Sequence, residues 1–290
     1  MVILLADAFA PDLPGRLSPF GEVTSDLSRV SEAEVVIVRS KTKVDKAMID
    51  KAPKLKYIIR GGVGVDTIDV DYAKQKGIAV DNTPEASSLA VAELAFALMI
   101  AMPNHIAEAD SSMKQGKWLK KELERTELSG KTLGLIGIGR IARELAIRAK
   151  AFGMKVIAYD KYVEKSDAAQ MMSLDEVYAK SDYISIHTPL TDETKGMINA
   201  AAIAKMKKGA YLINTCRGPV VKVEDVAAAL KDGKLAGFAT DVYDKEPPEG
   251  SPLLSAPRVV LTPHLGASTE ENLLRLGDCI VDRMKKYRGK

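Results

Sequence analysis

Cysteine is scarce in this chain of 290 residues, which contains only Cys216 and Cys279. Small secreted domains that depend on disulfides carry more cysteines at regular spacings. Cys216 also lies inside a motif at residues 214–218 that we assign to chemistry below, and this argues against a disulfide between the two. We therefore expect reduced thiols and a cytoplasmic setting.

Long hydrophobic runs are also missing. The longest apolar helical pattern, residues 89–102, contains Glu93 and ends at Pro103, so it is too short and too interrupted to span a bilayer. The N-terminal stretch VILLADAF has no basic region before it and includes Asp7, which excludes a signal peptide. We expect no membrane partner.

Charge of one sign is not in large excess, because the formal net charge is +3 and the pI is about 8.6. Nucleic-acid-binding domains present dense basic patches. The nearest candidate, residues 117–121 around Trp118, is more typical of a solvated segment. We expect no nucleic-acid partner.

Low-complexity sequence is absent, and the chain is 46% hydrophobic and 28% charged, as folded domains are. Its length exceeds what one hydrophobic core usually serves, which favours two domains.

Short apolar runs alternate with helical patterns along the whole chain. In the first part the predicted strands are residues 2–6, 35–39, 57–60 and 78–81. In the second part they are residues 132–137, 155–160, 183–187, 210–215, 237–241 and 259–262. Strands that are apolar on both faces and separated by helices form parallel sheets covered on both sides. The pattern predicts an α/β fold with two doubly wound domains.

The predicted domain limits follow from two connecting helices, at residues 85–102 and 267–287. We expect residues 1–98, completed by 268–290, to form a substrate-binding domain, and residues 99–267 to form a nucleotide-binding domain. In open α/β sheets ligands bind beyond the carboxyl ends of the strands. We therefore expect the site in an interdomain cleft.

A dinucleotide fingerprint opens the second domain. Residues 132–142 read TLGLIGIGRIA, so that Gly137, Gly139 and Ala142 lie between a strand and a helix. The first glycine allows the tight turn, the second lets the backbone approach a pyrophosphate, and a small third residue lets the helix pack closely. Asp160 ends the next strand, where a carboxylate binds the ribose hydroxyls and repels a 2′-phosphate. The pattern predicts NAD, with no metal.

Histidine is rare, since the chain has only three, and His264 directly follows a predicted strand. Imidazole can take the proton of an alcohol during hydride transfer. Glu246 could orient the ring by binding its second nitrogen. The alternatives are a buried structural histidine and a surface carboxylate in a proline-rich loop.

Arg217 follows another predicted strand and precedes Gly218. Its planar guanidinium suits bidentate binding of a substrate carboxylate beside the reacting carbon. Arg217, Glu246 and His264 are therefore the predicted catalytic residues.

These residues lie within motifs that resemble the D-isomer-specific 2-hydroxyacid dehydrogenases. The motifs occur in order along nearly the whole chain: IVRSKTKVD, RGGVGVDTID, NTPEASSLAVAELA, HTPLTDETKGMIN, NTCRGPVV, ATDVYDKEPP and PHLGAST. The resemblance implies a flavodoxin-like substrate domain and a Rossmann domain that binds NAD. It gives His264 the role of proton acceptor, Glu246 that of its partner and Arg217 that of carboxylate anchor.

The resemblance also implies the remaining contacts. Expected cofactor contacts are Val63, Gly137, Gly139, Arg140, Ile141, Asp160, His187, Thr188, Thr215, Cys216, Arg217, Asp241, His264, Gly266 and Ala267. Expected substrate contacts are Arg39, Arg60, Gly61, Gly62, Val63 and Gly64, in which the glycine-rich loop shares the substrate carboxylate and the two arginines bind a phosphate. Each arginine could instead pair with a neighbouring carboxylate.

The resemblance implies a homodimer formed through residues 102–128, with Trp118 at the interface or else buried in its own domain. Within the family, the chain resembles the members that oxidise 3-phospho-D-glycerate to 3-phosphohydroxypyruvate for serine synthesis. The alternatives are reduction of glyoxylate or hydroxypyruvate, another D-2-hydroxy acid, or a non-enzymatic NAD-sensing corepressor. No serine-sensing regulatory domain is expected after residue 290.

Overall fold

A computed structural model of the protein describes residues 1–289. Two compact units are present: unit 1 comprises residues 1–90 together with the chain from residue 267 onward, and unit 2 comprises residues 91–266. The sequence analysis placed the first limit at residue 98, which lies inside helix α4 (Ser88–Ala101). A continuous helix offers no pattern at which the limit could be read, and the predicted domain limits stay a prediction.

Unit 1 is built on a parallel sheet of five strands in the order β2-β1-β3-β4-β5. The strands are β1 (Val2–Leu5), β2 (Glu22–Thr24), β3 (Val35–Val38), β4 (Tyr57–Arg60) and β5 (Ala79–Asn82). This is the flavodoxin-like order that the resemblance implied. Strand β2 was not predicted, because it is a short edge strand that is not buried and therefore lacks an apolar pattern.

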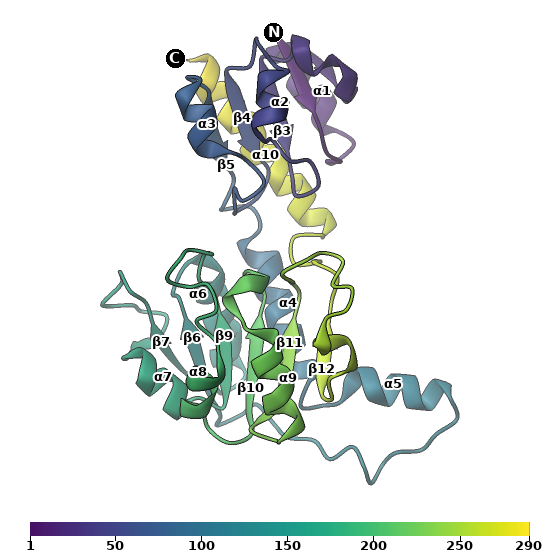
Figure 1. The fold of residues 1–290 in the computed structure, drawn as a ribbon, viewed down its shortest axis with the longest axis vertical. Helices are drawn as coiled ribbons and strands as arrows, with labels where there is room; N and C mark the ends of the chain where they lie inside the picture. The colour runs from purple at the N-terminus through teal and green to yellow at the C-terminus, as the bar shows by residue number, and fades with distance from the viewer. Residues whose placement is uncertain (290) are drawn as a thin grey trace. The chain divides into compact units, whose positions relative to one another are not determined.

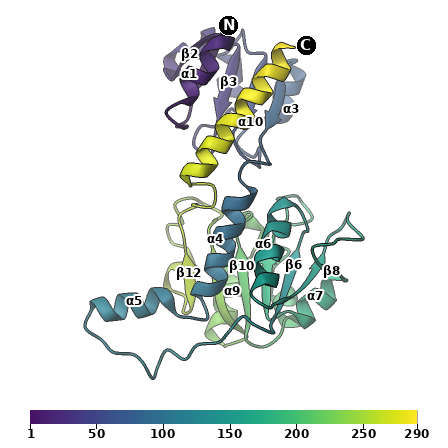
Figure 2. The ribbon, with the colours of Figure 1, turned by 180° about the vertical axis from the view of Figure 1, so that it is seen from behind.

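Alternate residues of these strands are buried on opposite faces. Ile3, Leu5 and Ile37 pack with helix α10 (Glu270–Arg288) and helix α1 (Leu13–Leu17) on one face. Leu4 and Val36 pack with α2 (Lys46–Asp50) and α3 (Val70–Gln75) on the other. Figure 2 shows α10, in yellow, lying across the sheet. Two 3-10 helices, Ser18–Phe20 and Leu27–Glu32, complete the unit.

Unit 2 is built on a parallel sheet of seven strands in the order β12-β11-β10-β9-β6-β7-β8. The strands are β6 (Thr132–Ile136), β7 (Lys155–Tyr159), β8 (Gln170–Met171), β9 (Tyr183–Ile186), β10 (Ala210–Asn214), β11 (Leu235–Thr240) and β12 (Val259–Leu261). The strand order reverses beside β6, which is where doubly wound sheets bind ligands. Gly137 follows β6 directly.

Helices cover both faces of this sheet (Figures 1 and 2). On one face α4 and α6 (Arg140–Ala151) contribute Phe96 and Leu145 to the core. On the other lie α7 (Leu174–Lys180), α8 (Ala200–Lys205) and α9 (Val223–Lys231), with the 3-10 helices Gly218–Val220 and Pro252–Ser255 nearby. The predicted fold class, two doubly wound α/β domains, is confirmed.

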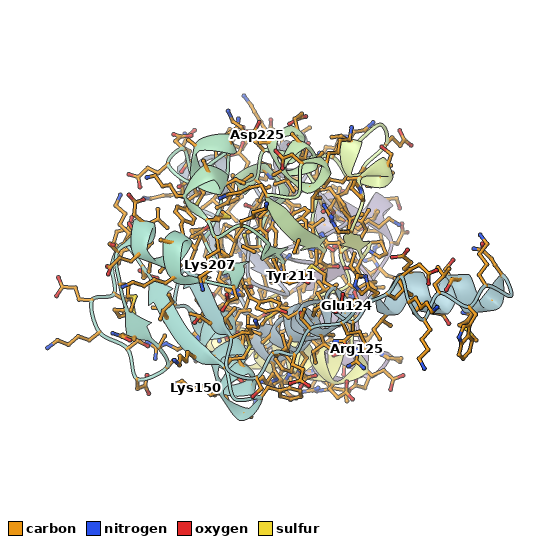
Figure 3. All side chains as sticks on the ribbon, turned by 90° about the horizontal axis from the view of Figure 1, so that it is seen from below. Glu124, Arg125, Lys150, Lys207, Tyr211 and Asp225 are labelled. Atoms are coloured by element: carbon orange, nitrogen blue, oxygen red, sulfur yellow. The ribbon has the colours of Figure 1, made fainter. Side chains whose placement is uncertain are left out.

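Helix α5 (Ile106–Lys114) extends away from the body of unit 2, and the chain returns without regular structure (Figures 1 and 3). The returning chain is tied to the start of the helix, because the His105 ring contacts the Glu124 carbonyl at 3.0 Å and Arg125 donates to Asn104 at 2.6 Å. Trp118 is 74% exposed. Its burial within its own domain, one of the two expectations, is therefore wrong.

Two expectations about the chain as a whole can be compared with residues 1–289. Cys216 and Cys279 are free thiols. Within this part of the chain no single helix is long and apolar enough to cross a membrane; only α4 and α5 taken together reach that length, and they are bent by 65° at their junction.

Candidate active site

The turn after β6 can accept only glycine at its first position. Gly137 has φ +93°, and a Cβ there would lie 2.6 Å from the carbonyl oxygen of His187. Its N–H donates to the Tyr159 carbonyl at 2.8 Å, which ties the turn to the neighbouring strand β7. The absence of a side chain at Gly137 therefore brings the ends of β6, β7 and β9 together.

The N-terminus of α6 is open above this turn. Gly139 is the N-cap residue and supplies no side chain to cap the helix. Within residues 1–289, and apart from Gly139 and its two chain neighbours, no atom lies within 4 Å of the position that a Cβ at Gly139 would occupy. The first-turn N–H groups of a helix of this length form an anion site, and Ala142 is fully buried against the sheet as the fingerprint requires. The residues present therefore fit the pyrophosphate of a dinucleotide.

Asp160 is held by three backbone N–H groups. One carboxylate oxygen accepts from Ile138 at 2.9 Å, and the other accepts from Tyr162 at 2.8 Å and Val163 at 3.2 Å. Asp160 thus fastens the glycine turn to the turn after β7, a role that the sequence analysis did not assign to it. The adjacent Lys161 pairs with Glu193 at 2.7 Å.

His187 and Thr188 follow β9. The His187 ring contacts the Ser185 hydroxyl at 2.9 Å, and burial lowers the pKa of His187 to about 4. The ring is therefore neutral at physiological pH and is placed for packing below the glycine turn, not for proton transfer. Thr188 lies beside Met197, with 4.0 Å between its hydroxyl and the sulfur.

The loop after β10 carries Arg217 and is shaped by Asn214. The buried Asn214 accepts from the Cys216 N–H at 3.0 Å and donates to the Arg217 carbonyl at 2.9 Å. Arg217 donates to the Cys216 carbonyl at 2.6 Å. The hydroxyl of Thr215 is buried without a hydrogen-bond partner within residues 1–289, an open polar position that suits a bound group. The sequence analysis did not predict this role of Asn214, because its side chain bonds to backbone groups of its own motif and such bonds leave no sequence pattern.

Burial raises the pKa of the Cys216 thiol to about 11. The thiol therefore stays protonated at neutral pH and is not a nucleophile. Cys216 takes part in the loop through its backbone groups and through its thiol, which donates to Oδ1 of Asn214 at 3.1 Å.

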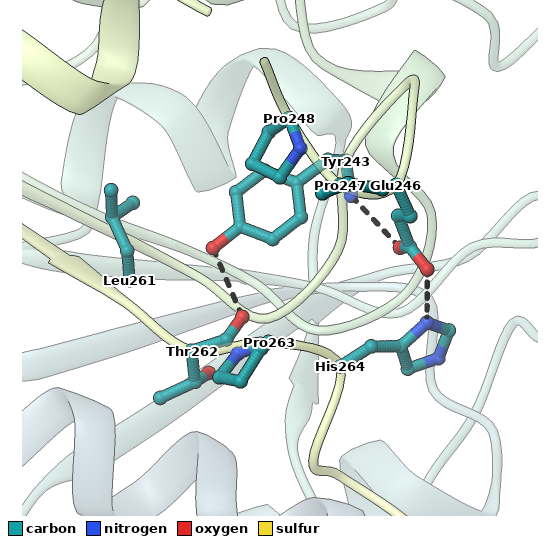
Figure 4. Close-up of a pocket in the computed structure, with 8 residues that line it drawn as sticks. All are labelled: Tyr243, Glu246, Pro247, Pro248, Leu261, Thr262, Pro263 and His264. Carbon is teal, nitrogen blue, oxygen red and sulfur yellow. Dashed lines mark hydrogen bonds and ion pairs between the residues drawn. The ribbon is translucent and has the colours of Figure 1, made fainter.

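His264 and Glu246 form a hydrogen-bonded pair (Figure 4). The Nδ1 atom of His264 lies 2.8 Å from Oε2 of Glu246, and the two side chains are 43% and 42% exposed. A carboxylate beside Nδ1 keeps the proton on that nitrogen and leaves Nε2 able to accept one. The predicted partnership between these residues is present in the geometry.

Asp241 fixes the turn that carries His264. This buried carboxylate accepts from the N–H groups of Leu265 at 2.7 Å and Gly266 at 2.8 Å, and from the Thr262 hydroxyl at 2.7 Å. His264 itself has φ +55°, a left-handed conformation that costs about 1 kcal/mol for a residue with a Cβ. Asp241 was predicted as a cofactor contact, but its hydrogen bonds also maintain this turn.

Gly218 lets two of these loops meet. A Cβ on Gly218 would lie 2.1 Å from the backbone carbon of Tyr243, so the loop after β10 touches the loop after β11. Arg217, Glu246 and His264 therefore come from three adjacent strand ends of unit 2.

An open pocket of about 420 Å³ borders the His264–Glu246 pair (Figure 4). Its remaining walls are largely apolar, and they are formed by Tyr243, Pro247, Pro248, Leu261, Thr262 and Pro263. Tyr243 and Thr262 were not predicted as site residues.

In unit 1 the expected substrate contacts gather around one loop. A Cβ on Gly62 would overlap the Arg60 guanidinium, and a Cβ on Gly61 would lie 3.5 Å from the side chain of Arg39. Arg39 is half-buried, donates to the Ala8 carbonyl at 3.2 Å, and has its pKa lowered by burial. Val63 is 39% exposed. The two arginines and the glycine-rich loop are thus neighbours.

Asp7 organises this region and was missed by the sequence analysis. It accepts from the N–H groups of Arg39 at 2.6 Å and Thr42 at 3.1 Å. The sequence analysis left open that Arg39 pairs with a neighbouring carboxylate, and the Asp7 carboxylate accepts from these two N–H groups and from the Thr42 hydroxyl at 2.7 Å.

The predicted site residues are divided between the units. Gly137, Gly139, Arg140, Ile141, Asp160, His187, Thr188, Thr215, Cys216, Arg217, Asp241, Glu246, His264 and Gly266 belong to unit 2. Arg39, Arg60, Gly61, Gly62, Val63, Gly64 and Ala267 belong to unit 1. Among residues 1–289 no group of three or more His, Cys, Asp or Glu side chains could hold a metal ion.

Comparison with known families decides the class of this site. Residues 96–266 match the NAD binding domain of the D-isomer specific 2-hydroxyacid dehydrogenases. The chain belongs to this family. The predicted fold, family and NAD cofactor are thereby confirmed.

Curated relatives fall into two groups. The D-3-phosphoglycerate dehydrogenase of Methanocaldococcus jannaschii is 43% identical over 98% of this chain and 57% of its own length. The hydroxypyruvate reductase of Thermotoga maritima is 46% identical over 92% of this chain and 91% of its own length. This chain thus spans about half the length of the phosphoglycerate dehydrogenases that it matches.

Solved structures of other proteins have a similar fold. The TT0316 protein of Thermus thermophilus has a TM-score of 0.91 and 34% identity, covering 98% of this chain and 96% of that one. A D-lactate dehydrogenase from Aquifex aeolicus, solved with NAD and lactic acid, has a TM-score of 0.87 and 32% identity, covering 100% and 96%.

We predict that His187 makes the folded state sensitive to acid. Its pKa is about 4 when folded and about 6.5 when unfolded, so the unfolded chain binds the extra proton between these values. The free energy of unfolding should therefore fall as the pH drops from about 6.5 to 4, by at most about 1.4 kcal/mol per pH unit from this residue. Urea denaturation of the wild type and His187→Gln at pH 7 and pH 5 measures this effect. The loss of stability between the two pH values should be smaller in the variant, and an equal loss in both proteins would contradict the assignment.

Proposed function

We propose that this protein is an NAD-dependent D-3-phosphoglycerate dehydrogenase, which oxidises 3-phospho-D-glycerate to 3-phosphohydroxypyruvate. The observation that carries the proposal is the convergence of Arg39 and Arg60 on the loop Gly61–Gly62 in unit 1. The phosphoglycerate dehydrogenases among the curated relatives, at 40–44% identity, support it.

The surroundings of these arginines suit a doubly charged group. Both guanidinium groups are partly withdrawn from water, where charge-assisted hydrogen bonds to phosphate are stronger. Gly61 and Gly62 are buried and carry no side chains that would compete for the space. The N–H groups of Gly61 and Gly62 donate to the Val38 carbonyl at 2.8 Å and to the Thr83 hydroxyl at 2.8 Å, so the attraction for an anion falls to the two arginines.

The chemistry at C2 falls to the residues of unit 2. NAD, when bound, accepts a hydride from C2 of the substrate. His264 takes the hydroxyl proton on Nε2 as the C2–O bond becomes a carbonyl, and Glu246 stabilises the protonated ring through Nδ1. Arg217 binds the carboxylate at C1 and fixes the orientation of C2. The same groups return the proton in the reductive direction.

Hydroxypyruvate reduction is the second candidate. It is favoured by the Thermotoga maritima relative, whose length this chain nearly matches. That reaction would use the same three residues of unit 2, so only the groups that meet the far end of the substrate can distinguish the two.

We predict that replacing both Arg39 and Arg60 with Gln lowers kcat/KM for 3-phospho-D-glycerate by at least about 100-fold, because each lost charge-assisted bond costs about 1.5–3 kcal/mol. Turnover of D-glycerate or hydroxypyruvate should change by less than about fivefold, since neither carries a phosphate. NADH absorbance with phosphorylated and plain acids measures both.

The matched control is Arg29→Gln, which removes an arginine of unit 1 that pairs with Glu22 and Glu32 away from the loop. Arg29→Gln should leave kcat/KM unchanged for every substrate. Equal losses with phosphorylated and plain substrates in the double variant would reject the phosphate site. A wild type that turns over hydroxypyruvate but not the phosphorylated acid would establish the second candidate.

We also propose that the enzyme prefers NAD to NADP. Asp160 places a negative charge after β7, where a 2′-phosphate would be repelled. Lys161, the nearest cation in sequence, is paired with Glu193 at 2.7 Å and is not available to offset that repulsion.

We predict that Asp160→Asn lowers the ratio of kcat/KM for NAD over NADP by at least about tenfold, because removal of one charge relieves the repulsion. Turnover with NAD should fall as well, since the single amide oxygen cannot accept both from the Ile138 N–H that fastens the glycine turn and from the Tyr162 and Val163 N–H groups on the other side. Initial rates with both cofactors measure the two effects. Asp167→Asn, which alters an exposed carboxylate of the same unit, serves as the control. Wild-type turnover with NADP equal to that with NAD would overturn the preference.

A homodimer formed through residues 102–128 is part of the proposal. Helix α5 and the chain after it expose Ile106 at 54%, Met113 at 55% and Trp118 at 74%. Large apolar side chains on a projecting arm are typical of a surface that a second copy covers.

We predict a mass in solution of twice the chain's 31.3 kDa, and weaker association in Trp118→Ala by at least about tenfold, the loss expected of a buried aromatic anchor. Sedimentation velocity over a concentration series measures both. Leu254→Ala, another exposed apolar residue of unit 2, should leave association unchanged. A monomeric wild type would contradict the proposal.

The proposed product is a 2-oxo acid with a phosphate at C3, the precursor from which serine synthesis proceeds. The free thiols of Cys216 and Cys279 support a reducing, cytoplasmic setting. A disulfide between them in protein isolated from its source without reductant would speak against that setting.

A further inference from the structure

Tyr243 contacts Glu246 and the turn that carries His264 (Figure 4). Its backbone N–H donates to Oε1 of Glu246 at 3.2 Å, while the other carboxylate oxygen faces His264. Its hydroxyl donates to the carbonyl of Thr262 at 2.9 Å. The same residue therefore contacts the carboxylate and the turn that carries the imidazole.

The Thr262 carbonyl is the point at which the hydroxyl acts on His264. This oxygen also accepts the backbone N–H of His264, at 3.1 Å. The two donors meet on one acceptor and close the turn in which His264 has φ +55°. Because that conformation is unfavourable for a residue with a side chain, it persists only where neighbouring bonds hold it.

Two supports thus act on the turn from different sides. Asp241 fixes the N–H groups that follow His264, and Tyr243 fixes the carbonyl that precedes it. Asp241 was also predicted to contact the cofactor. The Tyr243 hydroxyl, in contrast, makes its one hydrogen bond within residues 1–289 to the Thr262 carbonyl. Burial raises the pKa of Tyr243, so the hydroxyl remains protonated and able to donate.

We propose that Tyr243 is a positioning residue for hydride-transfer chemistry, which holds Glu246 and the His264 turn at a fixed distance from each other. In this arrangement the imidazole keeps its proton on Nδ1 and its Nε2 is available to the substrate. The inference rests on the proposed function only in assuming that His264 is the proton acceptor, and it holds for any 2-hydroxy acid.

The hydroxyl can be removed without disturbing the ring. Tyr243→Phe keeps the aromatic wall of the pocket and the backbone N–H to Glu246, and deletes only the bond to Thr262. A net hydrogen bond contributes about 0.5–1.5 kcal/mol, so we expect kcat to fall about fivefold while KM for NAD stays the same. Tyr211→Phe is the control, because Tyr211 lies near the start of β10, away from the site, and stacks on Tyr183; it is labelled in Figure 3.

A double-mutant cycle with Glu246→Gln separates positioning from general support of the fold. If Tyr243 acts through the pair, Tyr243→Phe lowers kcat about fivefold in the wild-type background and by less than about 1.5-fold in the Glu246→Gln background. Equal effects in both backgrounds would overturn the proposal. The melting temperatures of Tyr243→Phe and Tyr211→Phe should match.

A second measurement does not depend on activity. The chain has three histidines, so the ¹⁵N signals of the His264 ring can be assigned from single substitutions. At a pH where the ring is neutral, the two nitrogen shifts report which one carries the proton. We expect the Nδ1–H form to lose population in Tyr243→Phe but not in Tyr211→Phe. An unchanged tautomer ratio in Tyr243→Phe would reject the positioning role, whether or not a substrate is known. If the tautomer ratio changes as expected but no 2-hydroxy acid is turned over, only the proposed function is rejected.

Discussion

The hydrogen bonds to Asp241 are the interaction on which the rest of the site depends. A buried carboxylate directly after β11 accepts three hydrogen bonds from residues 262–266 and thereby fixes the bend of the chain after β12. Without an anion at this point, three donors would lack partners, which costs more than the bonds contribute when formed. The position of His264, its approach to Glu246 and the pocket beside them all follow from this bend.

Much of the fold could be predicted from the sequence because its strands are buried on both faces. Strands such as β3 and β10 read as continuous apolar runs, and no other structure suits runs of four or five such residues between helices. Strands β2 and β8 were missed because they are only three and two residues long and read EVT and QM, without an apolar run. The limit between the two units, which lies inside α4, could not be predicted because the helical pattern of the sequence continues through it.

The proposed reacting groups of the site could be read from the sequence, whereas the residues that support them could not. Arg217, Glu246 and His264 belong to chemical types that indicate a function, and each follows a strand. Asn214, Thr262 and Tyr243 act through backbone carbonyl and N–H groups, which every residue carries, so no pattern in the sequence identifies the partner. Tyr243 and the Thr262 carbonyl are separated by 19 residues and meet only because β11 and β12 are adjacent. Asp160 lies between these two groups. Its charge predicted a role in cofactor binding, but its hydrogen bond from the Ile138 N–H could not be predicted from the sequence.

The left-handed backbone of His264 has a consequence for how this position evolves. Glycine or asparagine would adopt φ +55° at lower cost, so selection for folding alone would drive the histidine out. A histidine at this position is therefore a cost to folding, which the bonds that Asp241 and Tyr243 make to the same turn offset. Loss of the reaction in a descendant chain should therefore be recorded first at residue 264, and only later in the loops that now support it.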